Sequence, residues 1–362
     1  MNNDPNSRPT RRRFLGQAGL IGLAAPLGLV ASPSAAGLLP VAMPDADAMP
    51  ICRAAATEAE PAGGVLRPIK LAWNASAICT SAAPVAKESG IFKRYGLDVD
   101  FVNFGGSTEQ LLEAIATGKA DAGIGMALRW LKPLEQGFDV KITAGIHGGC
   151  MRLLGSKAAN VTTLESLKGK VVAVSDQASP AKNFFSLLLA KRGIDPEREV
   201  EWRTYPLDLL NLAVEKGEAQ ALADGDPRTF IWAKDTRLTE VANNLSAEYA
   251  NRTCCVLAVR GSLVRDERPV ATALTRALLE AGTRVADQPE YAAKIFSGYG
   301  GKGTEEELAA MLRSHTHHHH PLGADLKGQI AAYVDELKIV KVIRARTDAA
   351  QFADRVYADV LS

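Results

Sequence analysis

GIFKRYGLDVDFVNFGGSTEQLLEAIATGKADAGIG, residues 90–125, contains two strands and a helix in the order that builds a parallel sheet. Its apolar pattern predicts a strand over 97–104, a helix over 108–117 and a second strand over 120–125. The turn between the first strand and the helix is Gly105-Gly106-Ser107. It offers backbone N–H groups and a hydroxyl at a helix N-terminus, a position that favours anions and polar ligand heads.

The same alternation of strands and helices extends along most of the chain. Strands are predicted over 69–74, 140–146, 171–175, 200–204, 219–223 and 256–260, and helices over 84–90, 126–137, 180–192, 206–216, 269–286, 289–297, 304–314, 323–337 and 347–361. Strands that alternate with helices pair mainly in parallel, so the sequence predicts an α/β protein.

The N-terminus indicates export. A twin-arginine pattern at residues 10–15 precedes an apolar run at 20–30 and small residues at 34–36, which predicts a cleaved signal peptide over 1–36. The alternative is a basic tail before a membrane anchor, although the run is short for a bilayer. Residues 37–64 are rich in Ala, Pro and Met and predict a flexible linker. We therefore expect a periplasmic protein exported by the twin-arginine pathway.

Composition and motifs narrow the class of protein. The formal net charge is +1, from 42 basic and 41 acidic residues, and no basic stripe with interleaved aromatics points to nucleic acid. The sequence contains no nucleotide-binding loop, no nucleophile-elbow serine motif, no paired-carboxylate pattern and no HExxH motif. These observations predict that the protein is not an enzyme and needs no cofactor.

Two phrases in residues 90–125, GIFKRYGLDVDF and GKADAGIG, and the Leu-Lys-Gly-Lys before the strand at 171 are typical of one family. Over residues 69–361 the chain resembles the periplasmic substrate-binding proteins of ABC transporters of the nitrate/sulfonate/taurine type. The resemblance implies a two-lobed type II periplasmic-binding fold, with interleaved α/β domains joined by two crossing strands near 146–154 and 251–259. The implied boundaries are 65–148 for the first part of lobe I, 149–254 for lobe II, and 255–362 for the return to lobe I and the C-terminal helices.

The resemblance also implies the function. Proteins of this family capture a small solute between their lobes and deliver it to the permease and ATPase subunits of an importer. We expect a monomer that binds a small oxyanion or a sulfonate-like solute, and no nucleic acid. A related fold is found in the fungal thiamine-pyrimidine synthase, an enzyme with a cysteine-rich iron motif, but only Cys254-Cys255 is similar to that motif.

Ligands of open α/β sheets lie beyond the carboxyl ends of strands, which selects the candidate binding residues. They are Asn74, Cys79, Thr80, Ser81, Gly105, Gly106, Ser107, Met126, Arg129, His147, Ser179, Asp224 and Asp226. Each has a structural alternative. The polar loop at 74–81 caps a helix, the glycines serve only the turn, Arg129 braces an acid such as Glu135, and the aspartates cap the helix at Pro227.

Four cysteines lie outside the linker, which holds Cys52, and sequence alone cannot pair them. Cys150 falls on the first crossing implied by the resemblance, and Cys254 and Cys255 fall on the return crossing. Three interpretations stay open: a disulfide between Cys150 and Cys254 or Cys255, buried free thiols, or a soft-metal site that includes His147 and Cys150.

Five of the six histidines lie at residues 315–320 in the segment His-Thr-His-His-His-His. Such a cluster binds zinc, copper or nickel, and its alternative is a solvated loop before Pro321. The alternative function is therefore a periplasmic metal-binding protein that uses His147 with Cys150, or the cluster from His315 to His320. Its candidate ligands are His147, Cys150, Cys254, His315, His317 and His318.

Overall fold

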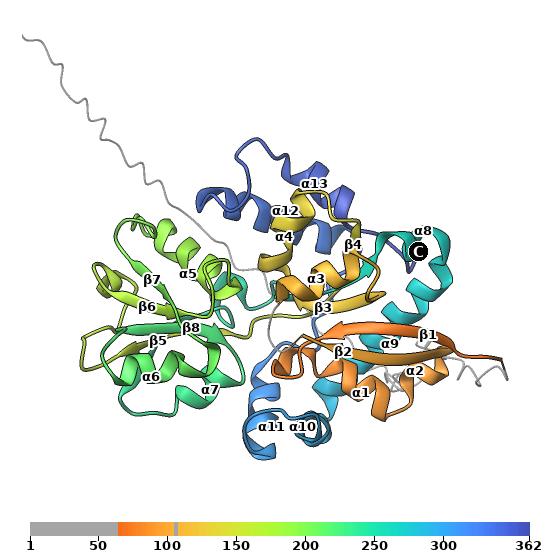
Figure 1. The fold of residues 1–362 in the computed structure, drawn as a ribbon, viewed down its shortest axis with the longest axis horizontal. Helices are drawn as coiled ribbons and strands as arrows, with labels where there is room; N and C mark the ends of the chain where they lie inside the picture. Colours follow the sequence, from red (N-terminus) through yellow and green to blue (C-terminus); the bar gives the residue numbers. More distant parts are fainter. Residues whose placement is uncertain (1–63, 105–107) are drawn as a thin grey trace, which may run out of the picture. The chain divides into compact units, whose positions relative to one another are not determined.

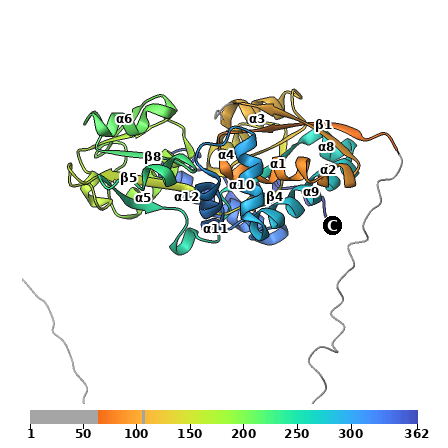
Figure 2. The ribbon, with the colours of Figure 1, turned by 90° about the horizontal axis from the view of Figure 1, so that it is seen from below.

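The computed structural model describes residues 64–104 and 108–362, all of which belong to one compact unit. The predicted signal peptide, all of the predicted linker except its last residue, and the Gly105-Gly106-Ser107 turn lie outside the described residues. Figures 1 and 2 show two groups of elements, each built around its own sheet. None of the described helices combines the length and the apolar character that a membrane span requires.

The first sheet has the order β2-β1-β3-β10-β4 and forms the core of the first lobe. β1 pairs in parallel with β2 and β3, whereas β10 runs antiparallel to β3 and β4. Its strands are β1 (Arg67–Trp73), β2 (Leu97–Asn103), β3 (Ala122–Met126), β4 (Val140–His147) and β10 (Cys255–Arg260). Its helices are α1 (Ala82–Glu88), α2 (Ile91–Arg94), α3 (Thr108–Ala116), α4 (Ala127–Glu135), α8 (Gly261–Asp266) and α9 (Arg268–Asp287), with the 3₁₀ helix η2 (Ile78–Thr80).

The second sheet has the order β7-β6-β8-β5-β9, and β5 runs antiparallel to both of its neighbours. Its strands are β5 (Met151–Ser156), β6 (Val171–Val174), β7 (Glu201–Thr204), β8 (Ala221–Gly225) and β9 (Leu238–Asn243). Its helices are α5 (Pro180–Lys191), α6 (Leu210–Glu215) and α7 (Arg228–Trp232), with the 3₁₀ helices η3 (Glu165–Leu167), η4 (Leu207–Leu209) and η5 (Ala247–Tyr249).

Four helices follow at the C-terminus, and one of them, α12, connects the two lobes. They are α10 (Pro289–Gly298), α11 (Glu305–Ser314), α12 (Gly323–Ile339) and α13 (Ala349–Val356). α12 contacts α4 of the first lobe and α5 of the second (Figures 1 and 2). On α12, Glu336 accepts hydrogen bonds from Lys191 at the end of α5 and from the hydroxyl of Tyr249, both at 2.9 Å. The helix therefore packs against both lobes.

The predicted fold class is confirmed: two α/β lobes alternate along the chain and are joined by two crossings. The crossings run from β4 to β5 and from β9 to β10, and each leads into a strand that pairs antiparallel with two neighbours. The sequence did not predict β5, β9, α2, α7 or α8 as separate elements. These elements are short, and a short apolar run carries little periodicity.

Glu135 links α4 to the segment before α13. Its carboxylate accepts from Lys132 Nζ at 2.8 Å, from the Arg344 backbone N–H at 3.1 Å and from the Thr347 hydroxyl. Burial by itself would raise the pKa of Glu135, but these bonds lower it from 4.5 to about 2. The ionised form is therefore the one that the folded protein stabilises.

We expect Glu135→Gln to remove a pH-dependent part of the stability. A carboxyl pKa that is depressed on folding stabilises the protein above about pH 4.5, and this stabilisation is lost as pH falls toward 2. The shift corresponds to about 3 kcal/mol at neutral pH. The measurement is the free energy of unfolding by denaturant at several pH values. Glu113→Gln is the control, because Glu113 lies on the exposed surface of α3. A difference between wild type and Glu135→Gln that stays constant from pH 7 to pH 3 would contradict it.

Candidate functional site

A cavity of about 50 Å³ lies where strands of both sheets end. Asn74 follows β1, Met126 ends β3, Ser175 and Asp176 follow β6, and Asp224 lies at the end of β8; all five line the cavity. β1 and β3 form a parallel pair in the first sheet, and β6 and β8 form a parallel pair in the second. The carboxyl ends of these two pairs meet at the cavity. This is the place where open α/β sheets hold ligands.

The N-terminus of α5 forms one wall of this central cavity. Ser179 caps the helix by accepting a hydrogen bond from the Lys182 N–H at 3.1 Å, and Pro180 occupies the first turn, where its missing N–H costs nothing. Ser179, Pro180 and Ala181 all line the cavity. The helix therefore adds its positive end to the site.

Two arginines neutralise the aspartates of β8 and the turn after it. Arg228 Nε donates to Asp224 at 2.7 Å, and Arg152 Nε donates to Asp226 at 3.2 Å. Asp226 also accepts from the Thr229 hydroxyl at 2.7 Å and lies 2.9 Å from His315 Nε2. The carboxylate of Asp226 is thus fully engaged inside the protein.

The pKa values of the two aspartates move in opposite directions. Burial raises the pKa of Asp224, and the attraction of Arg228 does not fully offset it. Burial would also raise the pKa of Asp226, but His315 and Arg152 reverse the effect and hold it below its usual value. Asp226 is therefore a stably ionised anchor.

Arg228 is the basic residue that lines the central cavity. Nε donates to Asp224, whereas the two terminal Nη nitrogens have no partner among the described residues. A guanidinium with unused terminal N–H groups is suited to an oxyanion, because its planar fork donates two parallel hydrogen bonds.

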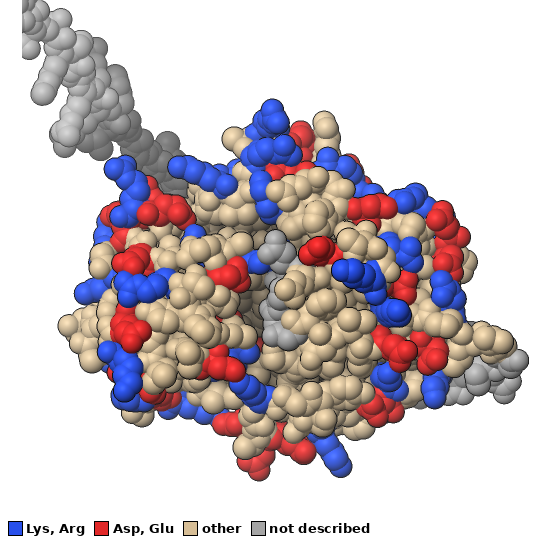
Figure 3. Space-filling view, in the orientation of Figure 1, with Lys and Arg blue, Asp and Glu red and all other residues tan. Residues whose placement is uncertain are grey.

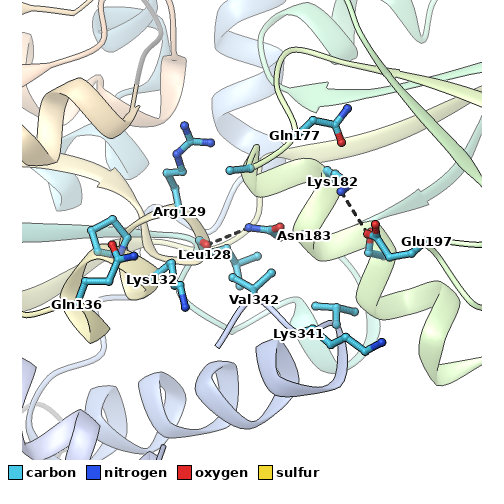
Figure 4. A pocket seen from close by; sticks show the side chains of 14 residues that line it. Leu128, Arg129, Lys132, Gln136, Gln177, Lys182, Asn183, Glu197, Lys341 and Val342 are labelled. Atoms are coloured by element: carbon cyan, nitrogen blue, oxygen red, sulfur yellow. Dashed lines mark hydrogen bonds and ion pairs between the residues drawn. The ribbon is translucent and has the colours of Figure 1, made fainter. Parts of the chain in front are cut away.

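A larger lateral pocket of about 460 Å³ lies beside α4 and α5. Figure 4 shows its side chains coming from these two helices, from the segments on either side of α5 and from the segment after α12. Three of its four cations are paired: Lys182 with Glu197 at 3.2 Å, Lys132 with Glu135 at 2.8 Å, and Arg129 with Asp176 at 2.5 Å. Most charges of this pocket are therefore already engaged in ion pairs.

Arg129 joins the two lobes. It lies on α4 of the first lobe, and its partner Asp176 follows β6 of the second lobe. A second link between the lobes joins α5 to α4. It is the hydrogen bond from Asn183 Nδ2 to the Leu128 carbonyl, at 3.3 Å (Figure 4). The structure thus places Arg129 in a bridge between the lobes, which is neither the ligand contact nor the brace to Glu135 that the sequence predicted.

Of the thirteen predicted binding residues, the structure brings five to the central cavity: Asn74, Met126, Ser179, Asp224 and Asp226. Cys79, Thr80, Ser81 and His147 are buried and do not line it. The Thr80 hydroxyl donates to the Asn74 and Ala77 carbonyls, both at 2.9 Å, and so holds the loop after β1. Asp176, Met151 and Arg228 line the cavity but were absent from the predicted set, although Asp176 could have been found because it follows a predicted strand.

The cysteines and histidines form a separate buried cluster at the crossings. Cys79, Cys150, Cys254 and Cys255, the cysteines of the described residues, are free thiols. Cys150 Sγ lies 3.7 Å from Cys254 Sγ, so the two are neighbours as predicted but are not bonded here. Contact with the Cys150 thiol lowers the pKa values of Cys79 and Cys254.

The histidine segment is not the solvated loop of the sequence analysis. His315 and His317 are 4% and 0% exposed, and only His318 is well exposed. The ring of His317 stacks on that of His147, with 4.8 Å between centroids. Burial lowers the pKa of His317 well below its usual range, so this imidazole is neutral. The segment is drawn inward because His315 pairs with buried Asp226.

Three solved structures of similar fold are named as binding proteins. The alkanesulfonate-binding protein SsuA from Xanthomonas axonopodis pv. citri, bound to MOPS, has a TM-score of 0.67 and 18% identity over 80% of this chain and 98% of its own. The aliphatic sulphonate binding protein SsuA from Escherichia coli has a TM-score of 0.68 and 16% identity, covering 81% of this chain and 92% of its own. The nitrate-binding protein NrtA from Synechocystis PCC 6803 has a TM-score of 0.67 and 15% identity, covering 82% and 87%.

These likenesses confirm the periplasmic-binding fold. No curated protein matches the chain. The model of the NMT1-like family matches residues 64–297, which include both sheets and both crossings. The family predicted from the sequence is thereby confirmed: the chain belongs to the NMT1-like family.

Proposed function

We propose that this protein is the periplasmic solute-binding component of an ABC importer and that it captures a small oxyanion or a short sulfonate in the central cavity. The observation that carries the proposal is the position of Arg228, with two unused Nη nitrogens, in a cavity where four parallel strands from both lobes end. Similar structures named as sulfonate- and nitrate-binding proteins support the same solute class.

The size of the cavity favours a small solute. A cavity needs a volume of about 10–15 Å³ to hold one water molecule. The central cavity, at about 50 Å³, therefore holds roughly four atoms the size of a water oxygen. Nitrate, bicarbonate and methanesulfonate are of this order, whereas a longer sulfonate requires the lobes to separate further. The carboxylates of the site are already paired with arginines, so they do not leave net negative charge to repel an anion.

The proposed mechanism is closure of the two lobes on the solute. A ligand that contacts both lobes stabilises the closed arrangement, and the closed form then presents a distinct surface to the permease.

Figure 3 shows Lys, Arg, Asp and Glu intermixed over one face, without a band of one sign. This distribution suits recognition by shape and local charge rather than binding to a nucleic acid. The role is one of binding and delivery, without catalysis.

We expect one member of a solute panel to raise the melting temperature of the purified protein. The panel holds nitrate, nitrite, bicarbonate, methanesulfonate and taurine at constant ionic strength, with chloride as the reference salt. A solute at about a hundred times its Kd stabilises by roughly 2.7 kcal/mol, which is several degrees for a chain of this size. Identical melting curves with all five, confirmed by calorimetric titration, would contradict the proposed solute class.

Arg228→Lys is expected to weaken binding of that solute about tenfold or more. Lysine keeps the positive charge but loses the planar fork, and a hydrogen bond to a charged group contributes about 1.5–3 kcal/mol. Isothermal titration calorimetry gives the Kd. Arg265→Lys is the matched control, because Arg265 pairs with Asp139 on an exposed surface away from the cavity. Equal affinities for wild type and Arg228→Lys would exclude Arg228 as the anion contact.

Breaking the bridge between the lobes is expected to favour the open protein. Arg129→Gln and Asp176→Asn each remove the same ion pair, so each should lower solute affinity severalfold, and the double variant should be no weaker than either. Small-angle scattering without solute should show a larger radius of gyration. Lys182→Gln is the control, since it breaks a pair within one lobe in the same lateral pocket. Additive losses in the double variant would contradict a shared bridge.

A further inference from the structure

The buried cysteine and histidine cluster lies where the two crossings meet. His147 ends β4, Cys150 directly precedes β5, and Cys254 directly precedes β10. The backbone N–H of Cys254 donates to the His147 carbonyl at 2.9 Å, so the two crossings are hydrogen-bonded to each other here. Cys79, in η2, approaches from the loop after β1. All four side chains are at most 4% exposed.

The distances within the cluster match the first coordination sphere of one ion. The sulfurs of Cys79 and Cys150 and a ring nitrogen of His147 all lie within 4.8 Å of one another. Cys150 Sγ lies 3.7 Å from Cys254 Sγ. Around a tetrahedral zinc with Zn–S bonds of about 2.3 Å, neighbouring sulfurs are about 3.8 Å apart. Cys79, His147 and Cys150 therefore already lie within reach of a single ion, and Cys254 lies beside Cys150.

The ring nitrogens of His147 add an independent observation. Neither Nδ1 nor Nε2 has a hydrogen-bond partner among the described residues, although His147 is 0% exposed. Both nitrogens of His317, stacked on His147, also lack partners within the same residues. Buried polar groups are nearly always satisfied, and leaving one unpaired costs about 1–3 kcal/mol. A metal–nitrogen bond would satisfy the ring of His147.

We propose that Cys79, His147 and Cys150 bind one thiophilic metal ion, Zn²⁺ or Cu⁺, and that Cys254, beside Cys150, moves in as the fourth ligand and so fastens the two crossings together. Thiolate and imidazole donors select these ions over Mg²⁺ or Ca²⁺, which prefer oxygen ligands. Asp226, the nearby buried carboxylate, is fully paired with Arg152, Thr229 and His315 and so is not a ligand. Binding converts thiols to thiolates and releases their protons to solvent. The site is separate from the central cavity and does not depend on the identity of the solute.

The test uses the purified, reduced, chelator-treated protein, isolated without metal-affinity resin because of its own histidines. Zn²⁺ and Cu⁺ are titrated against competing chelators of known affinity, and Co²⁺ serves as an optical probe of Zn²⁺ sites. We expect one tightly held equivalent, thiolate-to-Co²⁺ charge-transfer absorption, tetrahedral d–d bands and a rise in melting temperature. Cu⁺ bound far more tightly than Zn²⁺ would identify the ion as copper and also support the site.

Variants separate this cluster from the histidine-rich segment. Cys150→Ser and His147→Gln should weaken metal binding more than about 100-fold, since even the loss of an outer-shell partner costs 10–100-fold. His318→Gln, which removes the exposed histidine, should leave the affinity unchanged. The cobalt spectrum of the wild-type protein decides the matter if a cysteine variant fails to fold.

Several outcomes would overturn the proposal. They are absence of thiolate absorption with Co²⁺, metal binding lost in His318→Gln but kept in Cys150→Ser, and iron with inorganic sulfide in the purified protein. A Cys150–Cys254 disulfide that forms equally fast with and without Zn²⁺, seen by peptide mapping without reductant, would also overturn it. A bound ion should protect both thiols from oxidation.

Discussion

Close approach of the two crossings is the constraint on which the rest of this structure depends. A Cβ on Gly149 would lie 2.0 Å from the Asn244 carbonyl oxygen, and one on Gly148 would lie 3.0 Å from the Ala250 carbonyl oxygen, both on the second crossing. Only residues without a side chain fit at such distances. Because the crossings touch here, β10 can enter the first sheet between β3 and β4, and β5 can enter the second between β8 and β9. The antiparallel strands at these positions bring the carboxyl ends of parallel strands from both lobes to one cavity.

The ionised carboxylate of Asp226 is the second requirement, because a buried charge is tolerated only when it is paired and hydrogen-bonded. Its partners come from three places: Arg152 on β5, Thr229 on α7 and His315 after α11. The pairing with His315 explains why a histidine-rich segment, polar by composition, is partly buried. Further along the chain, Glu336 of α12 also binds the second lobe, where it accepts from Lys191 and Tyr249.

The sequence predicted the family, the two lobes and most of the long elements, because alternating strands and helices leave strong periodic signals. It also located Asn74, Ser179 and Asp224 correctly at strand ends or a helix start. It could not decide which polar residues face the cavity. Arg129 and Arg228 look alike in sequence, yet one bridges the lobes through Asp176 and the other keeps free Nη groups. The role of Arg129 depends on a partner more than 40 residues away in the sequence. The role of Arg228 depends on the register of β8, which positions Asp224 beside it. The inward course of residues 315–320 likewise follows from a contact with Asp226, 89 positions earlier.

The cavity and the cysteine cluster are neighbours that share backbone. The Cys150 carbonyl accepts a hydrogen bond from the Asp226 N–H at 2.8 Å, and Met151, the next residue, lines the central cavity. A change in position at Cys150 therefore moves a wall of the cavity, and a ligand that reshapes the cavity acts on Cys150 in turn. Any free-energy coupling between the two sites must be equal in both directions, because linkage is reciprocal. An ion that fixes Cys150 would thus change solute affinity by the same factor as the solute changes metal affinity. Each ligand strengthens binding of the other when both prefer the same arrangement of the crossings, and weakens it when they prefer different arrangements.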